Sequence, residues 1–177
     1  MSILPEKILL HCCCAPCAVA CVERLLAHGR QPGLCFANSN LDSREEYRRR
    51  LAAVEQLATH FQLPLFVVPY DHESWLAQTA ALAAEPERGR RCPVCFACNL
   101  ADADRVRAAN GYECFTTSLT VSPHKNSAVI FEAAAAFPAY DRWDFKKQDG
   151  FKRSLALTEL FGFYRQNYCG CEFARNR

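Results

Sequence analysis

The chain alternates short apolar runs with stretches of helical periodicity, and this alternation limits its fold more than any other feature. Residues 7–11, 33–38, 65–69 and 113–117 are apolar runs of strand length. Between them, apolar residues recur at the three- and four-residue spacing of amphipathic helices. Parallel strands need long crossover connections of this kind. The alternation therefore predicts an α/β fold, a Rossmann-like parallel sheet with helices on both faces.

Local signals predict where the helices begin and end. Ser43 and Glu46 have the spacing of a capping box and predict a helix start. Gly29 is placed to end the helix that follows the first strand. Further elements complete the predicted order: a helix through Trp75, a helix after Cys92, helices at about 126–137 and 151–161, and a short strand at 142–145.

Length and composition fit an ordinary globular domain. Of the 177 residues, 50% are hydrophobic and 23% charged. We expect one α/β domain over residues 1–177, with a cysteine-rich tail at about 162–177. No apolar run approaches the roughly 20 residues that span a bilayer, and the first residues lack the pattern of a signal peptide. These observations predict a cytoplasmic protein without a membrane partner.

Cysteine is the unusual component, with 12 residues. In a cytosolic chain with a real core, such a number favours metal binding or redox chemistry over a disulfide framework. One group, from Cys12 to Cys17, follows the first strand, and a second begins at Cys92 and Cys95. Ligands of parallel sheets bind beyond the carboxyl ends of the strands. The first group is therefore predicted at a ligand-binding edge.

The spacing of these cysteines suits a metal centre. A Cys-x-x-Cys pair at the start of a helix lies near free backbone N–H groups, which favour the thiolate that binds metal. Two groups far apart in sequence can then supply four thiolates to an iron–sulfur cluster or to zinc. Adjacent cysteines such as Cys13 and Cys14 make a poor zinc knuckle, so iron–sulfur is favoured. Two alternatives stay open: a thioredoxin-like thiol oxidoreductase using Cys14 and Cys17, and a zinc- or RNA-binding module.

The remaining cysteines divide into two kinds. Cys169 and Cys171 flank a glycine and can close a small, strained disulfide, the easily reduced kind. Cys21, Cys35 and Cys114 lie on apolar faces, and we expect them to be small core residues.

Five motifs in order resemble the QueH-type epoxyqueuosine reductases. The resemblance covers about residues 7–173, and the closing Tyr-Arg-Gln-Asn-Tyr-Cys-Gly-Cys is its most distinctive part. The motifs are Leu10–Cys17, Arg91–Phe96, Phe115–Leu119, Ser122–Lys125 and Tyr164–Cys171.

The resemblance implies an activity and a cofactor. The activity is the two-electron reduction of epoxyqueuosine to queuosine at the wobble position of tRNA, with an unidentified electron donor. The fold implied is a Rossmann-like sheet of the HUP type, related to the PP-loop ATP-pyrophosphatases. The residues carried over by position are Cys13, Cys14, Cys92 and Cys95 as ligands of a [4Fe-4S] cluster, Cys169 and Cys171 as a redox-active disulfide, and Cys17 for an additional iron ion.

The sequence departs from the family pattern at a few positions. Cys12 stands where a non-cysteine residue is usual and is an alternative to Cys13 as a ligand. Asn99 and Lys146 stand where arginine is common, and Cys98 is an extra thiol beside Asn99.

A tRNA substrate needs basic side chains for its phosphates. The net charge of +2 does not by itself indicate nucleic-acid binding. The run Arg48–Arg50 is interpreted as a solvated helix face. The predicted substrate contacts are Arg90, Arg91, Lys125 and Arg165, and His11, Tyr164 and Tyr168 are candidates for proton donation or base stacking, with core packing or tail anchoring as equal alternatives.

Overall fold

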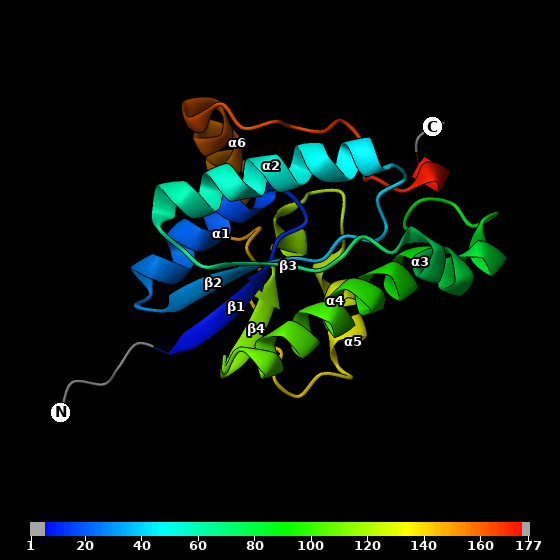
Figure 1. Ribbon diagram of the computed structural model, residues 1–177, viewed down its shortest axis with the longest axis horizontal. Helices are drawn as coiled ribbons and strands as arrows, with labels where there is room; N and C mark the ends of the chain where they lie inside the picture. Colours follow the sequence, from blue (N-terminus) through cyan, green and yellow to red (C-terminus); the bar gives the residue numbers. More distant parts are fainter. Residues whose placement is uncertain (1–5, 175–177) are drawn as a thin grey trace.

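A parallel sheet of four strands forms the centre of the protein (Figure 1). The structure is a computed structural model, and it describes residues 6–174. The strands lie in the order β3-β2-β1-β4, and each neighbouring pair is parallel. They are β1 (Lys7–His11), β2 (Gln31–Phe36), β3 (Leu65–Val67) and β4 (Cys114–Thr117).

Six helices cover the two faces of this sheet within the described residues. In Figure 1, α1, α2 and α6 lie on one side, and α3, α4 and α5 lie on the other. The helices are α1 (Ala15–Ala27), α2 (Arg44–Phe61), α3 (His72–Thr79), α4 (Arg91–Ala109), α5 (Ser127–Ala134) and α6 (Gly150–Phe161). Short 3-10 turns lie at η1 (Ala80–Leu82), η2 (Ser118–Val121) and η3 (Glu172–Ala174). The predicted α/β fold is therefore confirmed. None of the helices in residues 6–174 has the length and apolar character to cross a membrane.

The central strand β1 divides the core into two apolar layers. Its side chains alternate between the sheet faces, as expected for a strand. Ile8 and Leu10 join the layer under α1, α2 and α6, whereas Leu9 joins Leu100 and Phe115 on the α4 side. All five side chains are fully buried. Because both faces of β1 are covered, the chain that leaves its carboxyl end is held firmly in place.

Local signals predicted several helix ends correctly. Ser43 Oγ accepts a hydrogen bond from the Glu46 backbone N–H at 3.2 Å, so α2 begins where the capping spacing indicated. Helix α1 ends at Ala27, and Gly29 two residues later has a positive φ of 71°. Strand β2 begins at Gln31, two residues earlier than predicted, because Gln31 pairs in register with Lys7.

Residues 142–145 do not form the predicted strand. A single bridge joins Phe115 to Tyr140, and strand pairing stops there. Beyond it, the Thr120 hydroxyl donates to the Trp143 carbonyl at 2.9 Å and accepts from the Phe145 N–H at 3.1 Å. The prediction was wrong because a side chain, and not a neighbouring strand, satisfies this backbone.

Candidate metal centre

Three thiols gather where β1 ends and α1 begins. Cys13, Cys14 and Cys17 offer sulfur atoms that all lie within 4.8 Å of one another. Cys14 is the N-cap residue of α1, and its side chain makes no capping hydrogen bond. All three cysteines are free thiols. Within residues 6–174 this is the only such group of metal-ligating side chains, and its donor atoms suit a thiophilic metal.

Cys13 is the most acidic thiol of the group. The Cys13 and Cys14 sulfur atoms lie 3.8 Å apart, and the Ser118 hydroxyl donates to the Cys13 sulfur at 3.3 Å. Hydrogen bonds from Cys14 and Cys17 lower the pKa of Cys13 well below its ordinary value, with help from Lys125 and Ser118. The shared proton raises the pKa of Cys14 to about 12. The group therefore favours a thiolate at Cys13 over one at Cys14, and a bound cation would stabilise further deprotonation.

Cys12 points away from this group. It is fully buried in the apolar layer under α1, and its thiol donates to the Leu10 carbonyl at 3.4 Å. Burial raises its pKa well above the ordinary thiol value. Of the two adjacent candidates, Cys13 and not Cys12 therefore belongs to the sulfur group.

The second cysteine group lies on the first turns of α4. The Cys92 sulfur accepts from the Arg88 N–H at 3.3 Å, and Cys92 packs on the same small apolar cluster as Cys13. Cys95 packs instead beside Trp75 and Cys171. The sulfur atoms of Cys92 and Cys95 are not part of the group formed by Cys13, Cys14 and Cys17. Cys92 nevertheless packs on the apolar cluster that Cys13 contacts, and Cys95 packs on the cluster that contains Cys171.

The tail brings the third cysteine group to the same region. A hydrogen bond from the Cys171 thiol lowers the pKa of Cys169 to about 6, and the positive charge of Lys125 acts in the same direction. Cys169 also interacts electrostatically with Cys92 and Cys95. The tail pair therefore lies beside the α4 cysteines, although about 75 residues separate them in sequence.

Gly170 allows the tail to approach α2 closely. Its φ is 119°, a conformation that residues with a Cβ rarely adopt. A Cβ there would lie 2.4 Å from Leu41 Cδ2. The Gly170 carbonyl accepts from the Asp42 N–H at 2.8 Å. Glycine therefore suits this position, since another residue would be strained at this φ and would displace the Leu41 side chain.

Arg50 anchors the tail from beneath. Its side chain is 3% exposed and pairs with Glu46 at 2.6 Å. The guanidinium also donates to the carbonyls of Cys169 at 3.2 Å and Tyr168 at 3.3 Å. The Tyr164 hydroxyl donates to the second Glu46 oxygen at 2.9 Å. Glu46 and Arg50 thus connect α2 to both ends of the tail motif.

The interpretation of the arginine run as a solvated face was therefore wrong for Arg50, although Arg48 and Arg49 are exposed. A sequence signal was present. Arg50 lies four residues after Glu46 and four before Val54, on the buried side of α2.

Lys125 faces both cysteine groups. Burial lowers the pKa of its ammonium group, but the sulfurs of Cys169, Cys13, Cys17 and Cys14 raise it more, and the net pKa is above the ordinary value. Lys125 therefore stays protonated beside the sulfurs and can hold a negatively charged or proton-accepting group.

The other predicted substrate contacts lie elsewhere. Arg91 is 1% exposed, and its guanidinium donates to three carbonyls of the preceding turn, including Glu85 at 2.8 Å. Arg90 is exposed and pairs with Glu85 at 2.6 Å. Arg165 is exposed in the tail. Arg91 thus supports the start of α4, and Arg90 and Arg165 face solvent.

The three candidate proton donors are engaged in the fold. His11 is fully buried between the Thr117 hydroxyl at 2.8 Å and the Ala37 carbonyl at 2.9 Å, and burial lowers its pKa. The Tyr168 hydroxyl donates to Asp42 at 2.8 Å. With Tyr164 bound to Glu46, these hydroxyls hold the tail on α2.

A polar pocket of about 460 Å³ opens beyond the carboxyl ends of β2 and β3. Trp75 and Cys98 line it, and Trp75 also packs against Cys95. Asp71, Asn99 and Asp102 supply polar groups to its wall. This is the edge at which parallel sheets bind ligands.

Comparison with known proteins gives one consistent result. The model of the family "Epoxyqueuosine reductase QueH" matches residues 8–177. Curated proteins of that name are similar along nearly the whole chain. The Streptococcus pyogenes protein is 35% identical over 184 aligned residues, covering 98% of this chain and 71% of its own. The Acinetobacter baylyi protein is 33% identical over 175 residues, covering 96% and 80%, and the Staphylococcus aureus protein is 34% identical over 181, covering 95% and 75%.

Proposed function

Because this chain belongs to the epoxyqueuosine reductase QueH family, and so to the oxidoreductases, we propose that it reduces epoxyqueuosine in tRNA to queuosine. The epoxide oxygen leaves as water after the substrate takes up two electrons and two protons. The observation that best supports this proposal is the convergence of Cys13, Cys14 and Cys17 with Lys125 and the tail pair at the carboxyl edge of the sheet.

We propose that these thiols hold iron. The donor set fits, since Cys13, Cys14 and Cys17 are free, lie close together and already favour one thiolate. Cys13, Cys14, Cys92 and Cys95 would be the ligands of a [4Fe-4S] cluster, and Cys17 would bind an additional iron. Such a group supplies single electrons, and an iron with an open position supplies a Lewis acid.

The tail cysteines, Cys169 and Cys171, would store two reducing electrons as a pair of thiols. Oxidation of the Cys169 and Cys171 thiols to a disulfide releases two electrons and two protons, the amount that one epoxide needs. The low pKa of Cys169 keeps its sulfur reactive at neutral pH. An external electron donor would then reduce the disulfide for the next turnover.

Lys125 would bind the epoxide oxygen. Its ammonium group faces the sulfurs of both cysteine groups and keeps its proton there. A positive charge at this point stabilises negative charge that develops on the oxygen as the C–O bond breaks. The pocket beside Trp75 is the proposed entry for the modified base. We further propose that residues 1–177 act as one domain, with 162–177 as its tail.

A thioredoxin-like exchange by Cys14 and Cys17 is less well supported. Such enzymes lower the pKa of the first cysteine of the pair. Here the pKa of Cys14 is raised to about 12, and Cys13 carries the thiolate instead. A zinc- or RNA-binding module would leave the acidic thiol of Cys169 without a role.

The decisive experiment is anaerobic purification followed by iron, sulfide and zinc analysis and an assay on tRNA that carries epoxyqueuosine. We expect a brown protein with iron and sulfide that converts epoxyqueuosine to queuosine when a low-potential reductant is supplied. Nucleosides from digested tRNA report the conversion. A colourless protein with stoichiometric zinc and no conversion would reject the proposal.

A further inference from the structure

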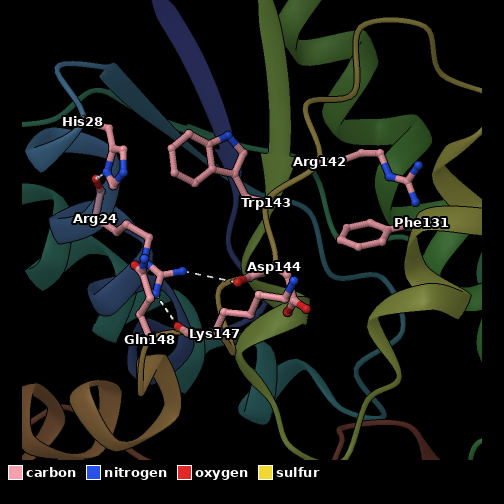
Figure 2. Close-up of a pocket in the computed structure, with 8 residues that line it drawn as sticks. All are labelled: Arg24, His28, Phe131, Arg142, Trp143, Asp144, Lys147 and Gln148. Atoms are coloured by element: carbon pink, nitrogen blue, oxygen red, sulfur yellow. Dashed lines mark hydrogen bonds between the residues drawn. The ribbon is translucent and has the colours of Figure 1, made fainter.

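A second polar site lies in the pocket drawn in Figure 2. It has a volume of about 460 Å³ and lies between α1, α5 and residues 142–148. No cysteine of the described chain lines it. The lining groups that matter are the cations of Arg24, Arg142 and Lys147, the rings of Phe131 and Trp143, and the carboxylate of Asp144.

Arg24 builds the floor of this pocket. It donates to the backbone carbonyl of Asp144 at 3.2 Å and to that of Lys147, as the dashed lines in Figure 2 show. These acceptors are neutral carbonyl groups, so they fix the guanidinium without cancelling its charge. The contacts also hold residues 142–148 against α1.

The pocket keeps an excess of positive charge. Arg142 is exposed and lies 4.7 Å above the centre of the Phe131 ring. Lys147 is exposed as well. The single carboxylate, Asp144, accepts a hydrogen bond from the Ser127 hydroxyl at 2.9 Å. Three cations therefore face one carboxylate.

Trp143 forms a fixed aromatic wall. Its indole N–H donates to Asp141 at 2.8 Å. Its ring stacks on Phe145 with centroids 5.5 Å apart, and the His28 ring meets it edge-on at 5.3 Å. Cations beside rigid aromatic rings are the combination with which proteins hold the backbone and bases of single-stranded RNA.

We propose that this pocket binds a phosphodiester and the adjoining nucleotide of the tRNA, outside the cysteine site; this inference rests on the proposed function. The position supports it. Lys146, next to Lys147, donates from its ammonium group to the Lys125 carbonyl, and the Lys125 side chain faces the cysteines. Cationic groups thus lead from the pocket to the site of chemistry. If the modified base of the RNA is bound at the cysteines, the backbone that flanks this base would contact these cationic groups.

The test is a charge reversal, Arg142→Glu with Lys147→Glu, against a matched reversal of two other exposed cations, Lys7→Glu with Arg48→Glu. Both double variants change the net charge equally. The pocket variant should fold, because the backbone carbonyls of residues 142–148 are held by Arg24, which both variants keep. Binding of a labelled, unmodified RNA hairpin with the anticodon loop is measured by fluorescence anisotropy from low to moderate salt.

The pocket variant is expected to weaken RNA binding roughly tenfold and to reduce the slope of log affinity against log salt by roughly 1, since the contact with one phosphate is lost. Its KM for tRNA rises in parallel, and its iron content is unchanged. The control variant keeps wild-type values. Two results would overturn the proposal for the pocket: RNA binding that weakens equally in both variants, or RNA binding that is unchanged in the pocket variant. If wild-type protein still reduces epoxyqueuosine, the proposed function is unaffected by either result. Failure of wild-type protein to bind RNA at any salt would overturn the proposal for the pocket together with the proposed function.

Discussion

The cysteines that meet near Lys125 belong to two regions with different structural support. Cys13 and Cys14 stand between a strand that is buried from Ile8 to His11 and a long helix, so packing on both sides fixes their backbone. Cys169 and Cys171 stand in a segment without helix or strand, between α6 and η3. One region is part of the core, and the other lies across its surface.

Polar contacts hold much of the second region. Arg50 and the Asp42 N–H bind the carbonyls of Tyr168, Cys169 and Gly170, and Cys171 packs near Trp75. Segments held by few contacts open at lower free energy than core elements. This contrast agrees with the proposed division of roles, in which the rigid region holds the metal and the tail exchanges thiols with an external reductant.

The largest expected effect separates the two regions directly. Cys13→Ser with Cys14→Ser removes two proposed ligands, so iron is lost and activity falls by roughly a thousandfold or more. Cys169→Ser with Cys171→Ser should keep the iron and abolish multiple turnovers only. Iron analysis and queuosine formation over time distinguish the two, with Cys114→Ser as the control. Unchanged turnover in the tail variant would remove the tail from the mechanism.

The next prediction uses thiol acidity. The pKa of Cys169 is about 6, whereas burial raises the pKa of Cys114 to about 11. Because the pKa of Cys169 is lowered to about 6, its thiol is mostly deprotonated above pH 6, and the thiolate is the form that iodoacetamide alkylates. The alkylation rate of Cys169 should therefore rise through pH 6 and level off near pH 7. At pH 7 it should exceed alkylation of Cys114 about a hundredfold, because the larger thiolate fraction outweighs its weaker nucleophilicity. Peptide mapping by mass spectrometry gives both rates, and a midpoint for Cys169 above pH 8 would contradict the prediction.

Local features of the fold were predictable because they depend on neighbouring residues. The first strand, the Ser43 cap and the placement of Cys13 and Cys14 at the end of a strand follow from spacing alone. The tail partners of Arg50 were not predictable in this way. Its partners Tyr168 and Cys169 lie 118 and 119 residues away, so nothing local shows that they reach α2.

The failed strand at 142–145 has the same kind of cause. Its sequence suits a strand, but the Thr120 hydroxyl binds its backbone from more than 20 residues away. Composition shows that a residue can bind or pack, and the tertiary contacts decide which it does.

A smaller effect tests how closely the tail lies on α2. Gly170→Ala introduces a Cβ at a φ of 119° and 2.4 Å from Leu41 Cδ2, so strain and overlap should cost roughly 2–4 kcal/mol of tail docking. Gly162→Ala is the matched control, because Gly162 also has a positive φ, of 67°, but has open space around it. Hydrogen exchange of residues 164–171 should speed up in the first variant alone. Equal exchange in both variants would show that the tail does not depend on this close contact.

The smallest effect isolates the anchoring by Arg50. Arg50→Lys keeps a positive charge beside Glu46 but loses the planar fork that reaches two tail carbonyls at once, a loss of about 1–2 kcal/mol. The tail should open roughly tenfold more often, and limited proteolysis after Tyr168 should speed up by that factor while the iron content stays constant. Arg48→Lys is the control, since Arg48 is an exposed arginine of the same helix. If both variants are cleaved at the wild-type rate, Arg50 does not hold the tail, and the cysteine pair owes its position to the packing of Cys171 near Trp75 instead.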